Sequence, residues 1–320
     1  MTRFLLRRLL LIPIAILLAN FAGFTYAHFA LNLQMRRNPF FAPLERPAPL
    51  LPAYATYLQK AIRLDFGSLP IGAGLPIGDV VWDAITASLG LLAITFIISI
   101  IVGLVVGAAS VRVDPPGVVG WLAPLSTVGL AMPSFYLGTL FIVGALAYAI
   151  QNGPDAPSIP TSGFGWDLHL LFPVLALMLR PTVQIAQLTA NLLAGELGKR
   201  YVVTARSVGN TWRTIRWKHV VRNAVAPIVL NMAGAFRLLV GELIVVEWLF
   251  AWPGIGRLLA WILIPTSGSH EAESLYFLHP SALAAALTVF ALFFLVADLL
   301  ASALVRSADP RLRAMDGDAA

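Results

Sequence analysis

The chain has 320 residues, of which 58% are hydrophobic and only 12% are charged. A soluble domain carries about 25% charged residues, so this composition excludes an ordinary globular protein and indicates a polytopic membrane protein. The chain holds no cysteine, which excludes disulfides, thiol nucleophiles and thiolate metal sites. The formal net charge of +6 does not indicate nucleic-acid binding, because the arginines separate by membrane side and form no stripe on a soluble face.

Runs without charged residues predict six membrane-spanning helices, since about 20 apolar residues cross the hydrocarbon of a bilayer. The expected fold class is therefore all-α. The predicted spans cover residues 9–34, 84–111, 125–150, 169–193, 225–250 and 281–305. The uncharged stretch 115–154 is long enough for two spans, but its prolines predict a broken lead-in followed by one span.

The distribution of cations supports six spans with both termini in the cytoplasm. This arrangement places 14 cations on cytoplasmic segments, six on outer segments, and Arg180 and Arg237 within spans. Cytoplasmic loops are enriched in Lys and Arg, whereas two spans over 115–154 would put the most basic loop outside. The N-terminal run also has the layout of a signal peptide, but its apolar part is too long and no A-x-A site follows, so we expect a retained anchor.

The expected organisation is an N-terminal span (1–34), an extracytoplasmic segment (35–83), a core of five spans (84–310) with a cytoplasmic loop (195–226), and a cytoplasmic tail (311–320). In the outer segment, residues 54–64 place apolar side chains at helical spacing opposite Lys60 and Arg63, which predicts a short interfacial helix. Such a helix either packs on the rim of the bundle or docks an extracytoplasmic partner.

The cytoplasmic loop predicts a helix-turn-helix outside the bilayer. A helix over about 196–208 ends at Gly209, a residue suited to the left-handed conformation, and Asn210 and Thr211 are suitable caps for a second helix through Arg222. Ala205 and Gly209 are four residues apart, so we expect them to share one face and leave a notch for another protein's backbone. An inert basic loop that follows the positive-inside rule fits these residues equally well.

The loop resembles a known motif. Residues 204–209, TARSVG, and the later His219, Arg222 and Pro227 resemble the EAA loop of ATP-binding-cassette importer permeases, in the form found in the dipeptide, oligopeptide and nickel group. Other blocks resemble the same family in the same order: LRRLLLIP at 6–13, GLAMPSFYLG at 129–138, GELIVVEWLFAWPGIGR at 241–257 and DPRLR at 309–313. The family's PGDP sequence after the first span is missing, Tyr201 stands near an acidic position, and residues 266–279 are an insertion, which leaves the substrate open.

The resemblance implies an inner-membrane permease with the fold of type I importers. It implies a second homologous permease, two ATPase subunits and an extracytoplasmic solute-binding protein as partners, with a peptide, nickel or another solute as substrate. The residues implied in coupling to the ATPase are Thr204, Ala205, Arg206, Gly209, His219 and Arg222.

The sequence contains no G-x-x-x-x-G-K-[ST] phosphate loop, so we expect ATP and Mg²⁺ in partner subunits, no cofactor in this chain and no enzymatic activity. His270, Glu271 and Glu273 are the one histidine and carboxylate cluster with metal-like spacing, and we interpret it as solvated surface.

Ionisable residues within the spans are further candidates, namely Arg180, Arg237, Glu242, Glu247 and Asp298. Such groups face the bundle interior or a water-filled cavity, so they either form interhelical ion pairs or line a path for a zwitterionic solute. Pro133 and Pro181 are expected to break their helices and free carbonyl groups toward such a cavity. We expect a structural role for Arg237, and the predicted pathway or gate residues are Pro133, Ser134, Phe135, Glu242, Glu247 and Trp252.

Two other classes of protein fit the composition. One is a secondary transporter driven by an ion gradient, with Glu242, Glu247 and Asp298 as proton or sodium sites, although no inverted repeat is apparent between the halves. The other is a membrane scaffold or receptor that transports nothing. Co-purification with a phosphate-loop ATPase would separate the importer from both.

Overall fold

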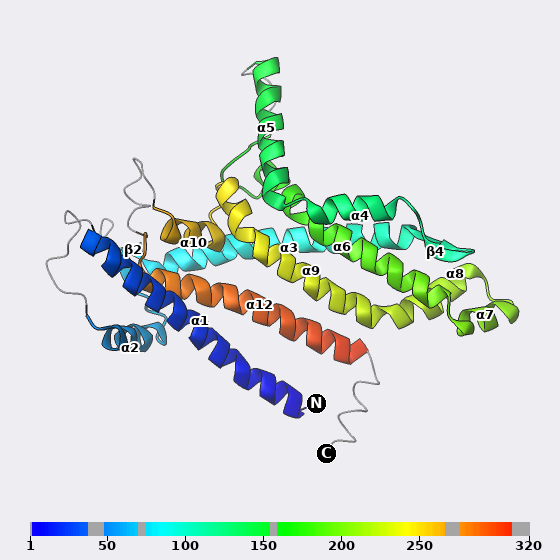
Figure 1. Ribbon diagram of the computed structural model, residues 1–320, viewed down its shortest axis with the longest axis horizontal. Coiled ribbons are helices and arrows are strands. Elements are labelled where there is room, and N and C mark those ends of the chain that lie inside the picture. The colour runs from blue at the N-terminus through cyan, green and yellow to red at the C-terminus, as the bar shows by residue number, and fades with distance from the viewer. Residues whose placement is uncertain (1, 38–47, 70–74, 154–158, 266–275, 309–320) are drawn as a thin grey trace. The chain divides into compact units, whose positions relative to one another are not determined.

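The computed structural model describes residues 2–37, 48–69, 75–153, 159–265 and 276–308 (Figure 1). Several sequence predictions therefore lie outside the described residues: the 309–313 block, the 311–320 tail, and the cluster of His270, Glu271 and Glu273.

The described chain is helical apart from two short hairpins, which confirms the all-α class. Its helices are α1 (Thr2–Arg37), α2 (Leu50–Ala61), α3 (Ile77–Ala109), α4 (Leu122–Ala131), α5 (Ser134–Asn152), the 3-10 turn η2 (Leu168–Leu170), α6 (Leu171–Leu197), α7 (Arg200–Ser207), α8 (Trp212–Thr214), the π-helical η3 (Ile215–Val220), α9 (Val221–Leu249), α10 (Ile255–Leu263) and α12 (Pro280–Ala308). One hairpin pairs β1 (Ser68–Leu69) with β2 (Leu75–Pro76), and the other pairs β3 (Val111–Val113) with β4 (Pro116–Val118), both antiparallel.

Among the described residues, six helical stretches are long and apolar enough to cross a membrane, as predicted. They are Leu11–Leu33, Ile77–Ala109, Ser134–Asn152, Leu168–Leu197, Trp212–Leu249 and Pro280–Leu299.

The predicted third span, 125–150, is wrong in its boundaries. α4 ends at Ala131 and α5 begins at Ser134, so the candidate span is Ser134–Asn152. Met132 adopts an extended conformation (φ −84°, ψ 115°), as expected before Pro133, whose ring disfavours a helical residue ahead of it. Pro181 has no such effect, because α6 continues through it from Leu171 to Leu197.

The chain forms two compact units. The first comprises Leu91–Phe250 with the part of α12 from Val296 onward, and the second comprises Thr2–Gly90 with Ala251–Leu295. In the first unit α6 and α9 pack along each other, and α3 lies close to α6. Cβ atoms placed on Gly103 and Gly107 would lie 2.9 Å from the Thr182 carbonyl oxygen and 2.6 Å from the Ala186 carbonyl oxygen, so only glycine permits this approach.

The second unit is organised around a buried asparagine of α1. The side chain of Asn20 donates hydrogen bonds to the Tyr57 hydroxyl of α2 (3.0 Å) and to the Thr288 hydroxyl of α12 (3.0 Å). Tyr54 of α2 donates to Asn20 in return (3.2 Å). Because α2 lies outside the spans, this network fixes the predicted interfacial helix to two membrane helices, α1 and α12.

Candidate functional site

The basic segment between α6 and α9, Arg200–Val220, differs from the predicted helix-turn-helix in both of its helices. The predicted helix over 196–208 is interrupted, because α6 ends at Leu197 and Lys199 is extended (φ −78°, ψ 148°) before α7 begins. The predicted second helix does not stop at Arg222. It continues through the π-helical turn η3 into α9, so one helical stretch runs from Trp212 to Leu249.

The turn inside the basic segment has the predicted geometry. Gly209 adopts φ +90°, a left-handed conformation in which a side chain is strained. Thr211 caps the next helix, since its hydroxyl accepts a hydrogen bond from the Thr214 amide (3.3 Å). The Asn210 side chain donates to the Ala205 carbonyl (3.1 Å), and the Arg206 guanidinium lies 4.8 Å from the centre of the Trp212 ring. These contacts hold α7 and α8 in a fixed relation.

The inner side of the basic segment is part of the core of the first unit. Val202, Ile215 and Val220 are buried in one cluster with Leu193 and Leu197 of α6. Arg216 also donates a hydrogen bond to the Ala108 carbonyl in the last turn of α3. The segment is therefore packed against two membrane helices and bonded to a third.

The predicted notch formed by Ala205 and Gly209 is not present. Ala205 is half-buried and packs against the core of its own chain, whereas Gly209 lies in the turn after α7. A Cβ atom added at Gly209 would meet no other atom within 4 Å. Gly209 is thus required by its backbone conformation, because the space beside it is open to solvent.

The predicted coupling residues of the basic segment and of the first turn of α9 differ in exposure. Thr204, Arg206, Gly209 and Arg222 are exposed, while His219 is half-buried. The aromatic Tyr201, near the position expected to be acidic, donates a hydrogen bond to the Glu196 carboxylate (2.8 Å), and burial raises the pKa of Tyr201. An acidic side chain is therefore present beside the segment, but at residue 196 of α6.

Four of the five charges predicted inside the spans form ion pairs between helices. Arg180 of α6 binds Glu242 of α9, and Arg237 of α9 binds Asp298 of α12. The side chains of the first pair are 28% and 15% exposed, and those of the second are 46% and 47% exposed. The ion-pair interpretation holds for these four residues, and only the second pair has a large solvent-accessible face in the isolated chain.

The other predicted pathway residues lie in different surroundings. Glu247 and Trp252 are fully buried, and the Trp252 indole donates to the Ala87 carbonyl of α3 (3.1 Å). Ser134 is buried at the start of α5, whereas Pro133 and Phe135 beside it are exposed. The role of these residues in a pathway stays a prediction.

Sequence reasoning missed several polar and small residues within the spans. Gln184 donates a hydrogen bond to Asn231 across α6 and α9 (3.4 Å), four residues along α6 from Arg180. Asn20 and the pair Gly103 and Gly107 were missed as well. A polar residue in an apolar run and the G-x-x-x-G spacing were the available signals.

Together these features define a class: a polytopic α-helical membrane protein with a basic segment packed tightly between two of its spans. Residues 99–314 match the sequence model of the family described as the binding-protein-dependent transport system inner membrane component. The chain belongs to this family, which confirms the resemblance found in the sequence.

Curated relatives extend the similarity over nearly the whole chain. The chain is 29% identical to the oligopeptide transport system permease protein OppB of Mycobacterium tuberculosis, over 98% of this chain and 99% of that protein. It is 23% identical to the oligopeptide transport system permease protein AppB of Bacillus subtilis, over 87% and 85% of the two chains. It is 28% identical to the glutathione transport system permease protein GsiC of Escherichia coli, over 83% and 80%.

Proposed function

We propose that this chain is the permease subunit of an ATP-driven importer for peptides. It pairs with a second homologous permease to enclose the pathway, and it works with two ATPase subunits and an extracytoplasmic solute-binding protein. Membership of a binding-protein-dependent transport family supports this proposal, as do relatives named for the transport of oligopeptides and of glutathione, itself a small peptide. ATP and Mg²⁺ belong to the partner subunits, and this chain makes and breaks no covalent bond.

The packing of the basic segment is the observation that carries the proposal. Its outer side presents Thr204 and Arg206 to the aqueous phase, while its inner side is buried against α6 and α9 through Val202 and Ile215. A displacement of the exposed side of the segment is transmitted to the membrane helices, because close-packed side chains transmit displacement. The segment is suited to couple closure of the ATPase subunits to movement of the membrane helices.

The proposed orientation places the basic segment and both termini in the cytoplasm. Four candidate spans precede Arg200 and six lie between the two ends of the chain, so these even numbers put the N-terminus, the segment and the C-terminus on one side. The concentration of cations in the segment follows the positive-inside rule, which makes that side the cytoplasm. Arg216 extends the coupling to α3 through its bond to the Ala108 carbonyl. When the ATPase subunits close, the segment would move with them and carry α6, α9 and α3 toward the outward-facing state.

Gly209→Glu tests the coupling role, with Gly209→Ala as its matched control. Both variants carry the same backbone strain at φ +90°, and neither added side chain meets an atom of this chain within 4 Å at its Cβ. The larger, anionic side chain is therefore expected to disturb the partner contact alone. In proteoliposomes Gly209→Glu should lower peptide uptake per ATP hydrolysed by about tenfold, as expected for an interface that loses roughly 1.4 kcal/mol, while Gly209→Ala stays near wild type.

Equal uptake per ATP in the two variants would refute the coupling role. Retention of the ATPase subunit during purification should be measured beside uptake, because loss of the complex and loss of coupling are different failures. The same preparation separates the importer from a gradient-driven transporter. Uptake should stop with vanadate and persist when the ion gradient is collapsed.

Two of the three carboxylates proposed for a gradient-driven mechanism are engaged in ion pairs. Glu242 binds Arg180 and Asp298 binds Arg237, so neither is available as a free proton or sodium site in this state. Within the importer we propose the half-exposed Arg237 and Asp298 pair as part of the pathway lining, since charges within spans face water or a partner and avoid lipid. Glu247, buried within the chain, remains our candidate for a gate near the Trp252 block.

A further inference from the structure

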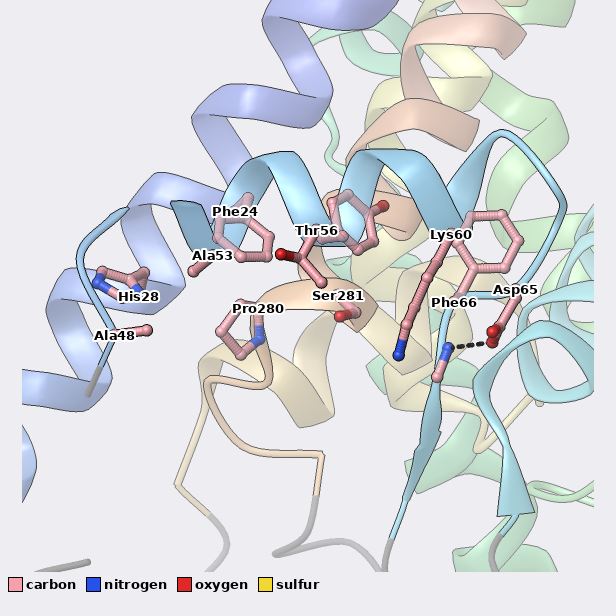
Figure 2. A pocket seen from close by; sticks show the side chains of 12 residues that line it. Phe24, His28, Ala48, Ala53, Thr56, Lys60, Asp65, Phe66, Pro280 and Ser281 are labelled. Carbon is pink, nitrogen blue, oxygen red and sulfur yellow. Dashed lines mark hydrogen bonds between the residues drawn. The ribbon is translucent and has the colours of Figure 1, made fainter. Parts of the chain in front are cut away.

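A pocket of about 350 Å³ lies in the second unit, beside the helix α2 (Figure 2). Its wall is formed by Phe24 and His28 of α1, by Thr56, Tyr57 and Lys60 of α2, by the turn Asp65, Phe66 and Gly67, and by Pro280 and Ser281 at the start of α12, with Ala48 and Ala53 completing it. The volume falls within the range of about 300–1,000 Å³ that is usual for small-molecule sites. Nothing in the proposed transport function uses this pocket.

The pocket lies at the membrane boundary. Phe24 and His28 belong to the second half of the span Leu11–Leu33, and Pro280 begins the span Pro280–Leu299. α2 and the turn after it lie outside the spans, yet they expose large apolar side chains: Leu51 is 69% exposed, Ile62 77% and Leu64 79%. Such side chains on an interfacial helix are stabilised by contact with lipid. This position near the ends of two spans places the pocket at the level where we expect the headgroups of one leaflet.

Two opposite charges face this pocket without pairing with each other. In Figure 2 Lys60 extends from α2 toward the side that holds Asp65 and Ser281, and His28 lies at the opposite side. Among the ion pairs of the described residues, none joins Lys60 to Asp65. The pocket thus presents a cation and an anion that are both available to a ligand.

The backbone fixes the relative placement of the two residues that carry these charges. The Asp65 amide donates to the Lys60 carbonyl (3.1 Å), and the Leu64 amide donates to the Ala61 carbonyl (2.9 Å). The Asp65 carboxylate in turn accepts a hydrogen bond from the Gly67 amide (2.9 Å). Leu64 is held at φ +62°, a strained conformation for a residue with a side chain, which closes this turn tightly. The backbone of the turn and the Asp65 carboxylate are therefore preorganised, and Lys60 is anchored at its backbone beside them.

The apolar part of the pocket complements the charges. Phe24 and Tyr57 are buried and stack with ring centres 5.1 Å apart, and Phe66 completes an aromatic wall. A ligand that matches all of these features carries a cation and an anion a few bonds apart on an apolar body.

We propose that this pocket binds the headgroup of a zwitterionic phospholipid, phosphatidylethanolamine. The lipid phosphate would contact the Lys60 ammonium, the lipid ammonium would donate hydrogen bonds to the Asp65 carboxylate, and the glycerol and acyl chains would follow the aromatic wall toward α1. Under the orientation proposed above the lipid belongs to the outer leaflet. The inference needs only a membrane surface at the pocket, and it stands or falls independently of peptide transport.

Native mass spectrometry of the full-length protein, purified with its co-purifying subunits and delipidated, tests the proposal. Phosphatidylethanolamine should be retained in preference to phosphatidylcholine, whose quaternary amine donates no hydrogen bond, and to phosphatidylglycerol, which has no cation. Lys60→Gln and Asp65→Asn should each reduce retention of phosphatidylethanolamine about fivefold or more, the effect of losing one charge-assisted hydrogen bond.

Arg63→Gln is the matched control, because Arg63 is an exposed cation on the same turn that does not line the pocket. Asp65→Asn keeps an oxygen that can accept from the Gly67 amide, so the turn should survive. Melting temperatures of all variants should be compared. If a variant unfolds, the retention of the three phospholipids by the wild-type protein tests the proposal by itself.

Two results would overturn the assignment. Equal retention of the three lipids, or an equal effect of Arg63→Gln and Lys60→Gln, would mean that lipid headgroups are held by the general surface charge of the protein. The pocket would then not be a specific lipid site. Displacement of the lipid by millimolar O-phosphoethanolamine, with no dependence on acyl chains, would mean that the pocket takes a soluble zwitterion instead. Loss of peptide uptake without a change in lipid retention would bear on the proposed function alone.

Discussion

The charged residues of the two interhelical ion pairs differ in how far their side chains are buried. Arg180 and Glu242 bind each other between α6 and α9 and are mostly buried, whereas Arg237 and Asp298 are about half exposed. A charge left without its partner in a low-dielectric interior is costly, while an exposed pair contributes little. The sequence favoured Arg237 as the structural arginine, but burial favours Arg180.

Arg180→Ala should destabilise the protein more than Arg237→Ala. Loss of one partner of a buried pair costs about 3–5 kcal/mol, and partial exposure of Arg180 favours the lower end of that range. Loss of the half-exposed Arg237 should cost about 1 kcal/mol or less. Thermal unfolding in detergent measures both, and the double variant Arg180→Ala with Glu242→Ala should recover part of the loss. An equal fall in melting temperature for the two single variants would contradict this ranking.

His279 provides a second test at the scale of a residue. It lies just before α12, and burial lowers the pKa of His279 below its ordinary value of 6.5. The unfolded chain therefore binds a proton at a higher pH than the folded chain does. The stability contributed by neutral His279 is complete above the unfolded pKa and is lost as pH falls from there toward the folded pKa.

We expect the melting temperature of the wild-type protein to fall between pH 7 and pH 5, and His279→Gln to remove part of that fall. The variant keeps a polar side chain without a titratable group. The melting temperatures of the variant and the wild type should therefore approach each other at low pH. Melting curves in one detergent at both pH values provide the measurement. Parallel pH dependence in the two proteins would show that other groups titrate.

At the scale of elements, the contact of α3 with α6 depends on two glycines four residues apart. The Cβ of an alanine at residue 107 would lie 2.6 Å from the Ala186 carbonyl oxygen, which belongs to the backbone and cannot rotate away. Small residues at this spacing allow membrane helices to approach closely, because packing replaces the hydrophobic effect inside lipid.

Gly107→Ala should therefore destabilise the first unit by about 1–3 kcal/mol, the usual cost of overpacking. Gly195→Ala is the control within α6, since a Cβ atom there meets nothing within 4 Å and alanine favours a helix by about 0.5–1 kcal/mol. Melting temperatures should move in opposite directions in the two variants. If both rise, the close approach of α3 and α6 is not present in the membrane.

The whole molecule is best tested through its topology. The chain has no cysteine, so a single introduced cysteine reports on one position without background. Ser162 is exposed between α5 and α6, and Ser207 is exposed at the end of α7, with one span between them.

A membrane-impermeant maleimide added to intact cells should label Ser162→Cys and leave Ser207→Cys unlabelled until the membrane is permeabilised. The proposed orientation of the basic segment requires this pattern. Labelling of both positions in intact cells, or the reverse pattern, would place the segment outside and would exclude its coupling to a cytoplasmic ATPase.

The sequence alone was sufficient for the properties that reside in short stretches of chain. Six apolar runs predicted six spans because hydrocarbon thickness sets their length. The need for φ above zero identified Gly209 as the turn residue that follows α7. The family resemblance was visible for the same reason, since its motifs are contiguous.

Partnership between distant residues was decided only by the tertiary structure. Three findings depend on which helix faces are brought together: Arg180 is the more buried arginine, Gly107 contacts α6, and Ala205 packs against the core of its own chain. The predicted notch failed for this reason, because spacing along one helix does not reveal which side is already covered. The unpaired Lys60 and Asp65 likewise became a site only when α2 was fixed against α1 and α12 by Asn20, since a binding pocket is made by packing between elements and is not encoded in any one of them.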